Sequence, residues 1–285
     1  MASEPGSLDK RLTPARGDIA AAHLKGQVEA QRFVEGAPHQ VIASAAAVRR
    51  APGDDAMLET QALFGDTFTV YDAKDGWAWG QMESDAYVGF VSAASLSAEI
   101  AAPTHAVAAL RTYVFSRPDL KSVPLLSLSL TSQVGVIETD GKWSKIAHGG
   151  WIYTAHLRPL PLYATDWVGE AERFLGAPYL WGGKDSLGLD CSGLIQTAMA
   201  SAGISAPRDT DMQEAFVGKP VTIDLGALKR GDLVFWKGHV GVMLDASRLL
   251  HANAHHMMTA IEPVREAVVR IKDAAGPVTS IRRTM

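Results

Sequence analysis

The 285-residue sequence has a single cysteine and no long apolar run, and these two shortages exclude several classes of protein. One thiol forms no disulfide within the chain and builds no cysteine-rich zinc site. No stretch approaches the ~18 apolar residues that span a membrane, and the first ten residues lack the apolar centre of a signal peptide. We therefore expect a cytoplasmic protein, and we ask what its one thiol does.

An excess of positive charge is also lacking. The sequence has 27 Lys and Arg residues against 31 Asp and Glu residues, for a net charge of −4. This balance argues against a general binder of nucleic acid or anionic membrane, although it leaves a local basic patch open. We expect a monomer with neither partner. At roughly 100–200 residues per domain, the length predicts two or three domains.

Residues 1–36 are polar and interrupted by glycine and proline. We interpret them as an arm that lies over the body of the protein, with a disordered tail as the alternative. Within this segment, Asp18 fits the N-cap position of a short helix over residues 18–24.

A repeated β pattern follows the arm. Residues 67–91 predict a strand, an Asp-Gly turn, a Trp-bearing strand and a third strand, and residues 133–153 repeat this order. Short strands at this spacing indicate two small β-barrels of one kind in tandem. We place the first barrel at 37–101 and the second at 102–161.

The pattern changes beyond residue 161. Helices are predicted first and strands afterwards, which is typical of an α+β domain rather than of βαβ units. The predicted helices cover 166–175 and 191–200, and the predicted strands cover 232–236, 239–244, 248–252 and 267–271.

Cys191 stands where a glycine-containing loop meets the second of these helices. The positive end of the helix dipole and the free N–H groups there lower the pKa of a thiol, and the thiolate is the nucleophilic form. The alternative is that Cys191 is a small buried side chain without a chemical role.

Two histidines favour the chemical role. In a hairpin that turns at residues 245–247, Gly241 lies opposite His251, so His239 and His251 share one face of the sheet. One imidazole then takes the thiol proton while a second polar group orients its ring. A one-residue slip in register would separate them. Asn253, on the same face as His251, is an alternative orienting residue.

Five ordered motifs carry a resemblance to a known family. They are Pro178-Tyr-Leu-Trp-Gly-Gly183, Asp190-Cys-Ser-Gly193, Gly231-Asp-Leu-Val-Phe235, His239-Val-Gly-Val242 and His251-Ala252. Over roughly 164–285 they resemble the NlpC/P60 cysteine peptidases, which have a papain-like α+β core and cleave cell-wall peptides. The preceding region resembles a pair of bacterial SH3 domains. The resemblance implies an NlpC/P60 catalytic domain at 162–285, preceded by two SH3-like barrels.

This combination is similar to the γ-D-glutamyl-L-diamino acid endopeptidases of the dipeptidyl-peptidase VI type. The resemblance implies hydrolysis of the bond between γ-D-Glu and the diamino acid in murein peptides with a free N-terminal L-Ala, as part of murein peptide recycling. One alternative is a catalytically silent module that binds murein peptides. Another is an exported peptidoglycan hydrolase that acts on the intact wall.

The resemblance also implies a role for each residue of the motifs. Cys191 is the nucleophile, His239 the general base and His251 the third polar residue, and Tyr179 stands beside the oxyanion. The implied substrate contacts are Asp190, Ser192, Trp181, Arg208, Asp209 and Thr210. The alternatives are a plain helix N-cap for Asp190 and core packing for Trp181.

In the tandem-SH3 members, an acidic side chain and a tyrosine of the first SH3 domain bind the free amine of the substrate. We assign these roles to Glu59 and Tyr87, with Glu83 and Asp85 as further candidates for the acid. The alternative for each acid is a solvated surface charge. An ammonium taken from water needs an anionic partner, so a blocked amine would leave the carboxylate unpaired.

No metal or cofactor site is predicted. Gly182-Gly183-Lys184 lacks the rest of a phosphate-binding loop. His255 and His256 have no carboxylate or further histidine at a useful spacing along the chain, so we expect a loop there.

Overall fold

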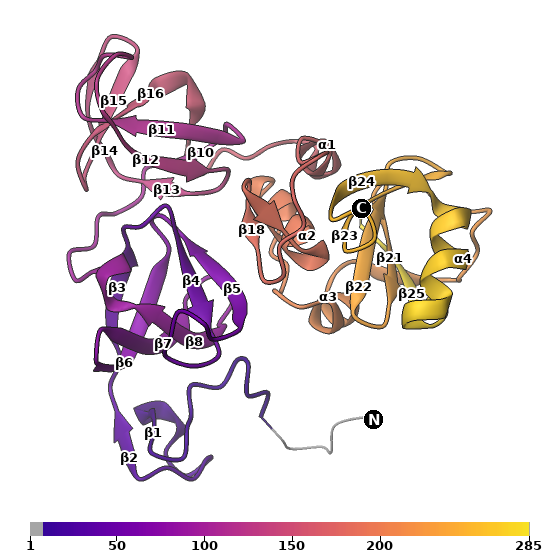
Figure 1. Ribbon diagram of the computed structural model, residues 1–285, viewed down its shortest axis with the longest axis horizontal. Coiled ribbons are helices and arrows are strands. Elements are labelled where there is room, and N and C mark those ends of the chain that lie inside the picture. Colours follow the sequence, from indigo (N-terminus) through magenta and orange to yellow (C-terminus); the bar gives the residue numbers. More distant parts are fainter. Residues whose placement is uncertain (1–7, 285) are drawn as a thin grey trace. The chain divides into compact units, whose positions relative to one another are not determined.

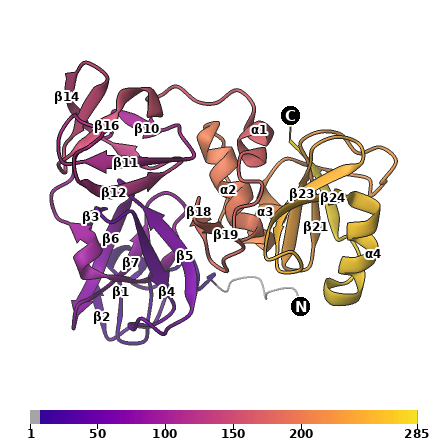
Figure 2. The ribbon, with the colours of Figure 1, turned by 45° about the horizontal axis from the view of Figure 1, so that its top comes forward.

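The computed structural model describes residues 8–284, which divide into two compact units (Figures 1 and 2). Unit 1 runs up to His105 and includes Tyr113–Leu128 and Ser132–Thr154. Unit 2 comprises Ala106–Thr112, Ser129–Thr131 and the chain from Ala155 onward. The segment predicted as the second barrel therefore contributes to both units. Residues 1–7, where the predicted arm begins, lie outside the described residues.

The first predicted barrel is a seven-stranded sheet of unit 1, in the order β5-β4-β8-β7-β6-β3-β9. Its core contains Val48, Phe68 and Val91. The predicted Asp-Gly hairpin is confirmed, because Asp75 and Gly76 turn with φ values of 50° and 81° between two paired strands. The strands are β3 (Ala37–Val41), β4 (Ala45–Arg49), β5 (Leu58–Leu63), β6 (Thr67–Lys74), β7 (Trp77–Met82), β8 (Val88–Ser92) and β9 (Leu96–Ser97), with the 3₁₀ turn η2 (Ala93–Ser95).

A second sheet has the order β12-β11-β16-β15-β14, and its strands follow the predicted repeat. Strand β14 ends at Asp140, and Gly141 turns the chain toward β15, which pairs Trp143 with Tyr153 of β16. The strands are β11 (Arg111–Phe115), β12 (Pro124–Ser129), β14 (Val136–Asp140), β15 (Trp143–Ile146) and β16 (Trp151–Tyr153). The remaining elements of this region are β10 (His105–Val107), β13 (Gln133–Val134), η3 (Thr154–His156) and β17 (Leu157–Pro159).

The helix predicted after Asp18 is wrong. Residues Ile19–Ala21 form strand β1, which pairs in parallel with β2 (Arg32–Val34), and only Ala22–Leu24 turn as the 3₁₀ helix η1. The β1 side chains are fully buried, so packing outweighs the helix preference of alanine. The described part of the arm contacts the first sheet, where Arg16 forms an ion pair with Asp72 at 2.7 Å.

Unit 2 contains the predicted α+β domain, and this fold class is confirmed. Its six-stranded sheet has the order β20-β25-β21-β22-β23-β24. The strands are β20 (Lys219–Val221), β21 (Asp232–Trp236), β22 (His239–Met243), β23 (Arg248–Asn253), β24 (Met258–Pro263) and β25 (Ser280–Arg283), and β18 (Lys184–Asp185) pairs with β19 (Gly188–Leu189). The helices are α1 (Trp167–Glu172), α2 (Cys191–Ser201), α3 (Thr210–Phe216) and α4 (Val264–Ala275).

Both faces of the six-stranded sheet are covered. Helix α2 lies on one face and α4 on the other (Figures 1 and 2). Side chains such as Phe235 and Val242 pack against α2, while Trp236 and Leu249 belong to the core under α4. Among the described residues, no helix is both long enough and apolar enough to span a membrane.

The strand predicted over residues 267–271 is wrong, because this segment lies inside α4. Val264, Ala267 and Ile271 are its buried side chains, at the i, i+3, i+7 spacing of a helix with one apolar face. The adjacent valines suggested a strand, but the spacing of the apolar residues decides the structure.

The predicted register of the β22–β23 hairpin is confirmed. Val242 pairs with Leu250 and Met243 with Leu249, which continues to Gly241 opposite His251. His239 and His251 therefore lie on one face of the sheet.

Candidate active site

Cys191 is the first residue of α2, as predicted, and its thiol is free and buried. The Asp190 carboxylate caps the helix by accepting a hydrogen bond from the Gly193 N–H at 2.7 Å. The thiol lies beside the backbone N–H of Val240, the residue that follows His239. The start of α2 and the start of β22 therefore meet at the thiol.

The predicted lowering of the thiol pKa is wrong. Burial, together with the charge of Asp190, raises the pKa of Cys191 to about 12. The N–H groups of Val240 and Ser192 favour the thiolate but do not outweigh burial. The resting thiol is therefore protonated, and its proton must leave as the nucleophile attacks.

Arg208 holds the loop and helix around the thiol. Its side chain is 1% exposed and binds Asp190 with two hydrogen bonds, of 2.6 and 3.0 Å. It also donates to the Ser192 hydroxyl at 2.8 Å. Asp190 and Ser192 are buried as well. These three predicted substrate contacts are thus brought together beneath the nucleophile, and their polar groups bind one another.

The two predicted histidines form a hydrogen bond. His239 Nε2 lies 2.8 Å from His251 Nδ1, and His251 is fully buried. Burial, together with the neighbouring His251 and Arg270, lowers the pKa of His239 to about 3. Because Nε2 faces His251, Nδ1 is the nitrogen left to act as a base.

Sequence reasoning missed a carboxylate next to this pair. His251 Nε2 lies 2.6 Å from Glu262 Oε1, and Arg270 forms an ion pair with the same carboxylate. Asn253, the alternative orienting residue, instead donates to the backbone carbonyl of His251. The sequence signal that could have indicated this contact is the acidic residue Glu262 in the segment that pairs with the strand of His251.

Tyr179 lies beside the nucleophile loop. Its backbone forms a parallel bridge with Leu189, and burial raises its pKa, as do the charges of Cys191 and Asp190. The hydroxyl is therefore protonated at neutral pH and is able to donate a hydrogen bond. Trp181 is 61% exposed, so the core-packing alternative for this residue is wrong.

The other predicted contacts lie at the start of α3 and in unit 1. Asp209 is the N-cap residue of α3, and Thr210 is its first residue. Glu59 forms an ion pair with Arg50, and Tyr87 is 3% exposed and packs in the barrel core. Both raise the pKa of Arg50, so the two candidates lie around one guanidinium.

The acidic alternatives of unit 1 lie near Tyr87 in the chain. Asp85 accepts a hydrogen bond from the Tyr87 N–H at 3.1 Å, and Glu83 is exposed.

One group of possible metal ligands could not be recognised from the spacing of residues around His255 and His256 in the sequence. Ligand atoms of His251, His256 and Glu262 lie within 4.8 Å of one another, because β23 and β24 run antiparallel. Each already has a protein partner: His239 and Glu262 for His251, Asn253 for His256, and Arg270 for Glu262.

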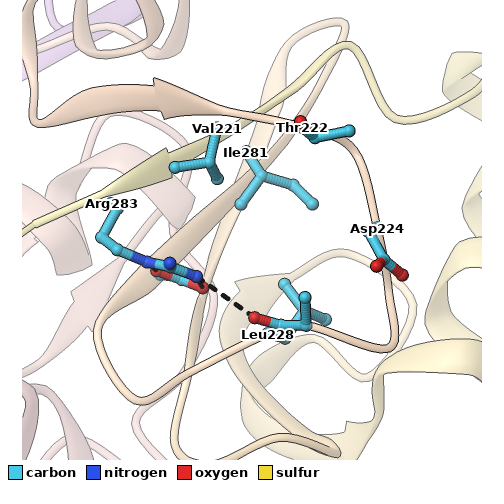
Figure 3. A pocket seen from close by; sticks show the side chains of 8 residues that line it. Val221, Thr222, Asp224, Leu228, Ile281 and Arg283 are labelled. Atoms are coloured by element: carbon cyan, nitrogen blue, oxygen red, sulfur yellow. Dashed lines mark hydrogen bonds and ion pairs between the residues drawn. The ribbon is translucent and has the colours of Figure 1, made fainter.

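A pocket of unit 2 lies elsewhere. It is lined by Val221, Leu228 and Ile281, with Asp224 at one wall and Arg283 at another (Figure 3). The Arg283 guanidinium is bound to Asp232 and to the carbonyl of Ala227. None of the predicted site residues lines this pocket.

The fold and site define a class. An α+β domain with a cysteine at a helix start and two hydrogen-bonded histidines on the adjoining sheet is a papain-like arrangement. Residues 176–273 match the NlpC/P60 family, and residues 48–96 match the bacterial dipeptidyl-peptidase SH3 domain.

The chain belongs to the NlpC/P60 family. It is 30% identical over 239 residues to a γ-D-glutamyl-L-lysine dipeptidyl-peptidase of Bacillus cereus, covering 73% of this chain and 71% of that relative. It is 33% identical over 123 residues to dipeptidyl-peptidase 6 of Lysinibacillus sphaericus, covering 43% and 42% of the two chains.

A solved structure has the same fold. The crystal structure of an NlpC/P60 family protein from Bacillus cereus superposes with a TM-score of 0.71 at 22% identity, covering 86% of this chain and 99% of that one. Family membership and the named relatives support a peptidase.

Proposed function

We propose that the protein is a cysteine peptidase that hydrolyses the bond between γ-D-Glu and the diamino acid in murein peptides with a free N-terminal L-Ala. The observation that carries the proposal is the hydrogen bond between His239 and His251 at the strand start where the Cys191 thiol lies. The relative named a γ-D-glutamyl-L-lysine dipeptidyl-peptidase supports the choice of bond.

In the first half of the reaction, Cys191 Sγ attacks the γ-carbonyl carbon of D-Glu as His239 Nδ1 takes the thiol proton. Burial keeps His239 neutral at physiological pH, so the ring is available as a base. N–H groups at the start of α2 and the Tyr179 hydroxyl stabilise the tetrahedral oxyanion. Collapse of this intermediate breaks the C–N bond, and the leaving amine takes the proton from His239.

In the second half, water hydrolyses the thioester. His239 takes a proton from the attacking water, the C–S bond breaks, and the proton returns to the sulfur of Cys191. The products are the L-Ala-γ-D-Glu dipeptide and a free diamino acid. Mass spectrometry of a tripeptide digest tests this assignment: the two products are expected, and cleavage at the L-Ala bond would contradict it.

Recognition of the free amine gives a prediction for the substrate. N-acetylation of L-Ala is expected to lower kcat/KM by ~10–100-fold, because the neutral amide has no positive charge to offer the carboxylate that binds the ammonium. The measurement compares initial rates for the free and acetylated tripeptides. Equal rates would remove the amine anchor from the proposal.

The same assay identifies the acid. Glu59→Gln is expected to reduce the preference for the free amine, with the exposed Glu83→Gln as the matched control. A loss of preference in the Glu83 variant alone would transfer the role to that residue.

The cellular role we propose is recycling of murein peptides in the cytoplasm. A recycling enzyme of this specificity is expected to cleave soluble tripeptides and to release no fragments from purified sacculi. Release from sacculi at a rate comparable to tripeptide cleavage would favour a hydrolase of the intact wall.

A further inference from the structure

We propose that Glu262, held by Arg270, is a positioning residue that fixes the proton positions on both histidines and thereby leaves His239 Nδ1 free to accept the thiol proton. This inference rests on the proposed roles of Cys191 and His239. It adds the carboxylate of Glu262 and the guanidinium of Arg270 to the predicted Cys191, His239 and His251.

The sheet places Glu262 beside His251. In the β23–β24 pair, Ala260 lies opposite His251 and Glu262 lies opposite Leu249, so Glu262 is the diagonal neighbour of His251 on the same face. Both ring nitrogens of His251 are in use, with Nδ1 on His239 at 2.8 Å and Nε2 on Glu262 at 2.6 Å.

The charge state of Glu262 decides the direction of these hydrogen bonds. The guanidinium of Arg270 binds Oε1 of Glu262, the same oxygen that faces His251 Nε2, and a carboxylate bound to a guanidinium is ionised. An ionised carboxylate only accepts hydrogen bonds, so His251 must carry its proton on Nε2.

The remaining proton positions follow from this one. The His251 side chain is fully buried, and burial disfavours a second proton on its ring, so the ring is neutral and its Nδ1 has no proton. His251 Nδ1 therefore accepts from His239 Nε2–H. A neutral His239 with its proton on Nε2 has an unprotonated Nδ1, which is the state that a general base requires.

Arg270 keeps the carboxylate in place. It comes from α4, which packs against the face of the sheet that carries Leu249, and its guanidinium binds the Glu262 oxygen that faces His251. The side chain of Glu262 is 12% exposed. A carboxylate with two charged or polar partners in a nearly buried place has little freedom to turn away.

Nuclear magnetic resonance tests the proton positions directly. In long-range ¹H–¹⁵N spectra of the wild-type protein, His239 and His251 are both expected as neutral rings with the proton on Nε2. The spectra need no substrate, so they test this inference even if the proposed substrate is wrong. A proton on Nδ1 of His251, or a doubly protonated His251, would overturn the inference.

Alkylation of the single thiol tests the consequence. Glu262→Gln is expected to slow the reaction of Cys191 with iodoacetamide by ~10–100-fold. It is expected to lower kcat on the tripeptide by a similar factor, with little change in KM. Glu262→Asp, which keeps the charge, is expected to recover part of the loss. Glu266→Gln, an exposed acid in the first turn of α4, is the matched control.

The rates separate positioning from folding stability. If Glu262 were only structural, Glu262→Gln would lower the melting temperature and leave the alkylation rate of the folded protein within twofold of wild type, and that result overturns the inference. Should this variant fail to fold, Arg270→Gln replaces it: a severalfold slower alkylation supports the inference, and an unchanged rate overturns it.

Discussion

Replacement of Cys191 by alanine is expected to lower hydrolysis of an L-Ala-γ-D-Glu-diamino acid tripeptide by ~10⁴-fold or more, because no other group replaces the nucleophile. The sequence has only one cysteine, so no second thiol substitutes for it. The folded state is expected to persist, since alanine fills most of the same buried space and retains a helix start capped by Asp190. Product release followed by chromatography measures the loss.

A rapid-quench experiment on the wild-type protein complements this variant. Mass spectrometry is expected to detect the L-Ala-γ-D-Glu acyl group as a thioester on Cys191 during turnover. A module that only binds murein peptides would form neither thioester nor product. Residual activity of Cys191→Ala within tenfold of wild type would contradict the assignment of the nucleophile.

Replacement of Arg208 by leucine is expected to lower the free energy of unfolding of unit 2 by about 3–5 kcal/mol. The substitution leaves the Asp190 carboxylate nearly buried and without its cationic partner. It also removes the hydrogen bond that Arg208 donates to the Ser192 hydroxyl. The first turn of α2 is therefore expected to loosen, and kcat is expected to fall. Urea denaturation followed by circular dichroism measures the change in stability.

Arg230 is the matched control for Arg208. It binds Asp166 and Glu172, both at 2.8 Å, but all three side chains are well exposed. Exposed ion pairs contribute about 0–1 kcal/mol, so Arg230→Leu is expected to change stability by no more than that. If the two variants lost the same stability, burial of the Arg208 ion pair would not be the reason.

The sequence predicted the parts of the site that depend on local patterns. The position of Cys191 at a helix start followed from the Asp190 cap and the loop before it. The alignment of His239 with His251 followed from the length of one hairpin turn, because a two-stranded antiparallel register is fixed by its turn.

The contribution of Glu262 required contacts between elements that the sequence does not order. The register of β24 and the packing of α4 bring Glu262 and Arg270 to His251, and the α4 segment itself was interpreted as a strand. Adjacent β-branched residues in a short segment are compatible with a helix and with a strand. The spacing of the buried residues distinguishes the two only when the packing partners of the segment are known.

The pKa of Cys191 could not be predicted from its helix position. The helix start and the local N–H groups stabilise the thiolate. The depth of burial depends on the whole of unit 2, and it decides the direction in which the pKa of Cys191 shifts.

The burial of Cys191 also determines how the protein behaves when no substrate is present. Peroxides and disulfides react with thiolates rather than with protonated thiols. With a pKa of about 12, the thiol of Cys191 holds its proton at physiological pH and is a poor target for both. Without substrate the protein is therefore expected to react slowly with oxidants, and its nucleophile arises only as the thiol proton passes to His239.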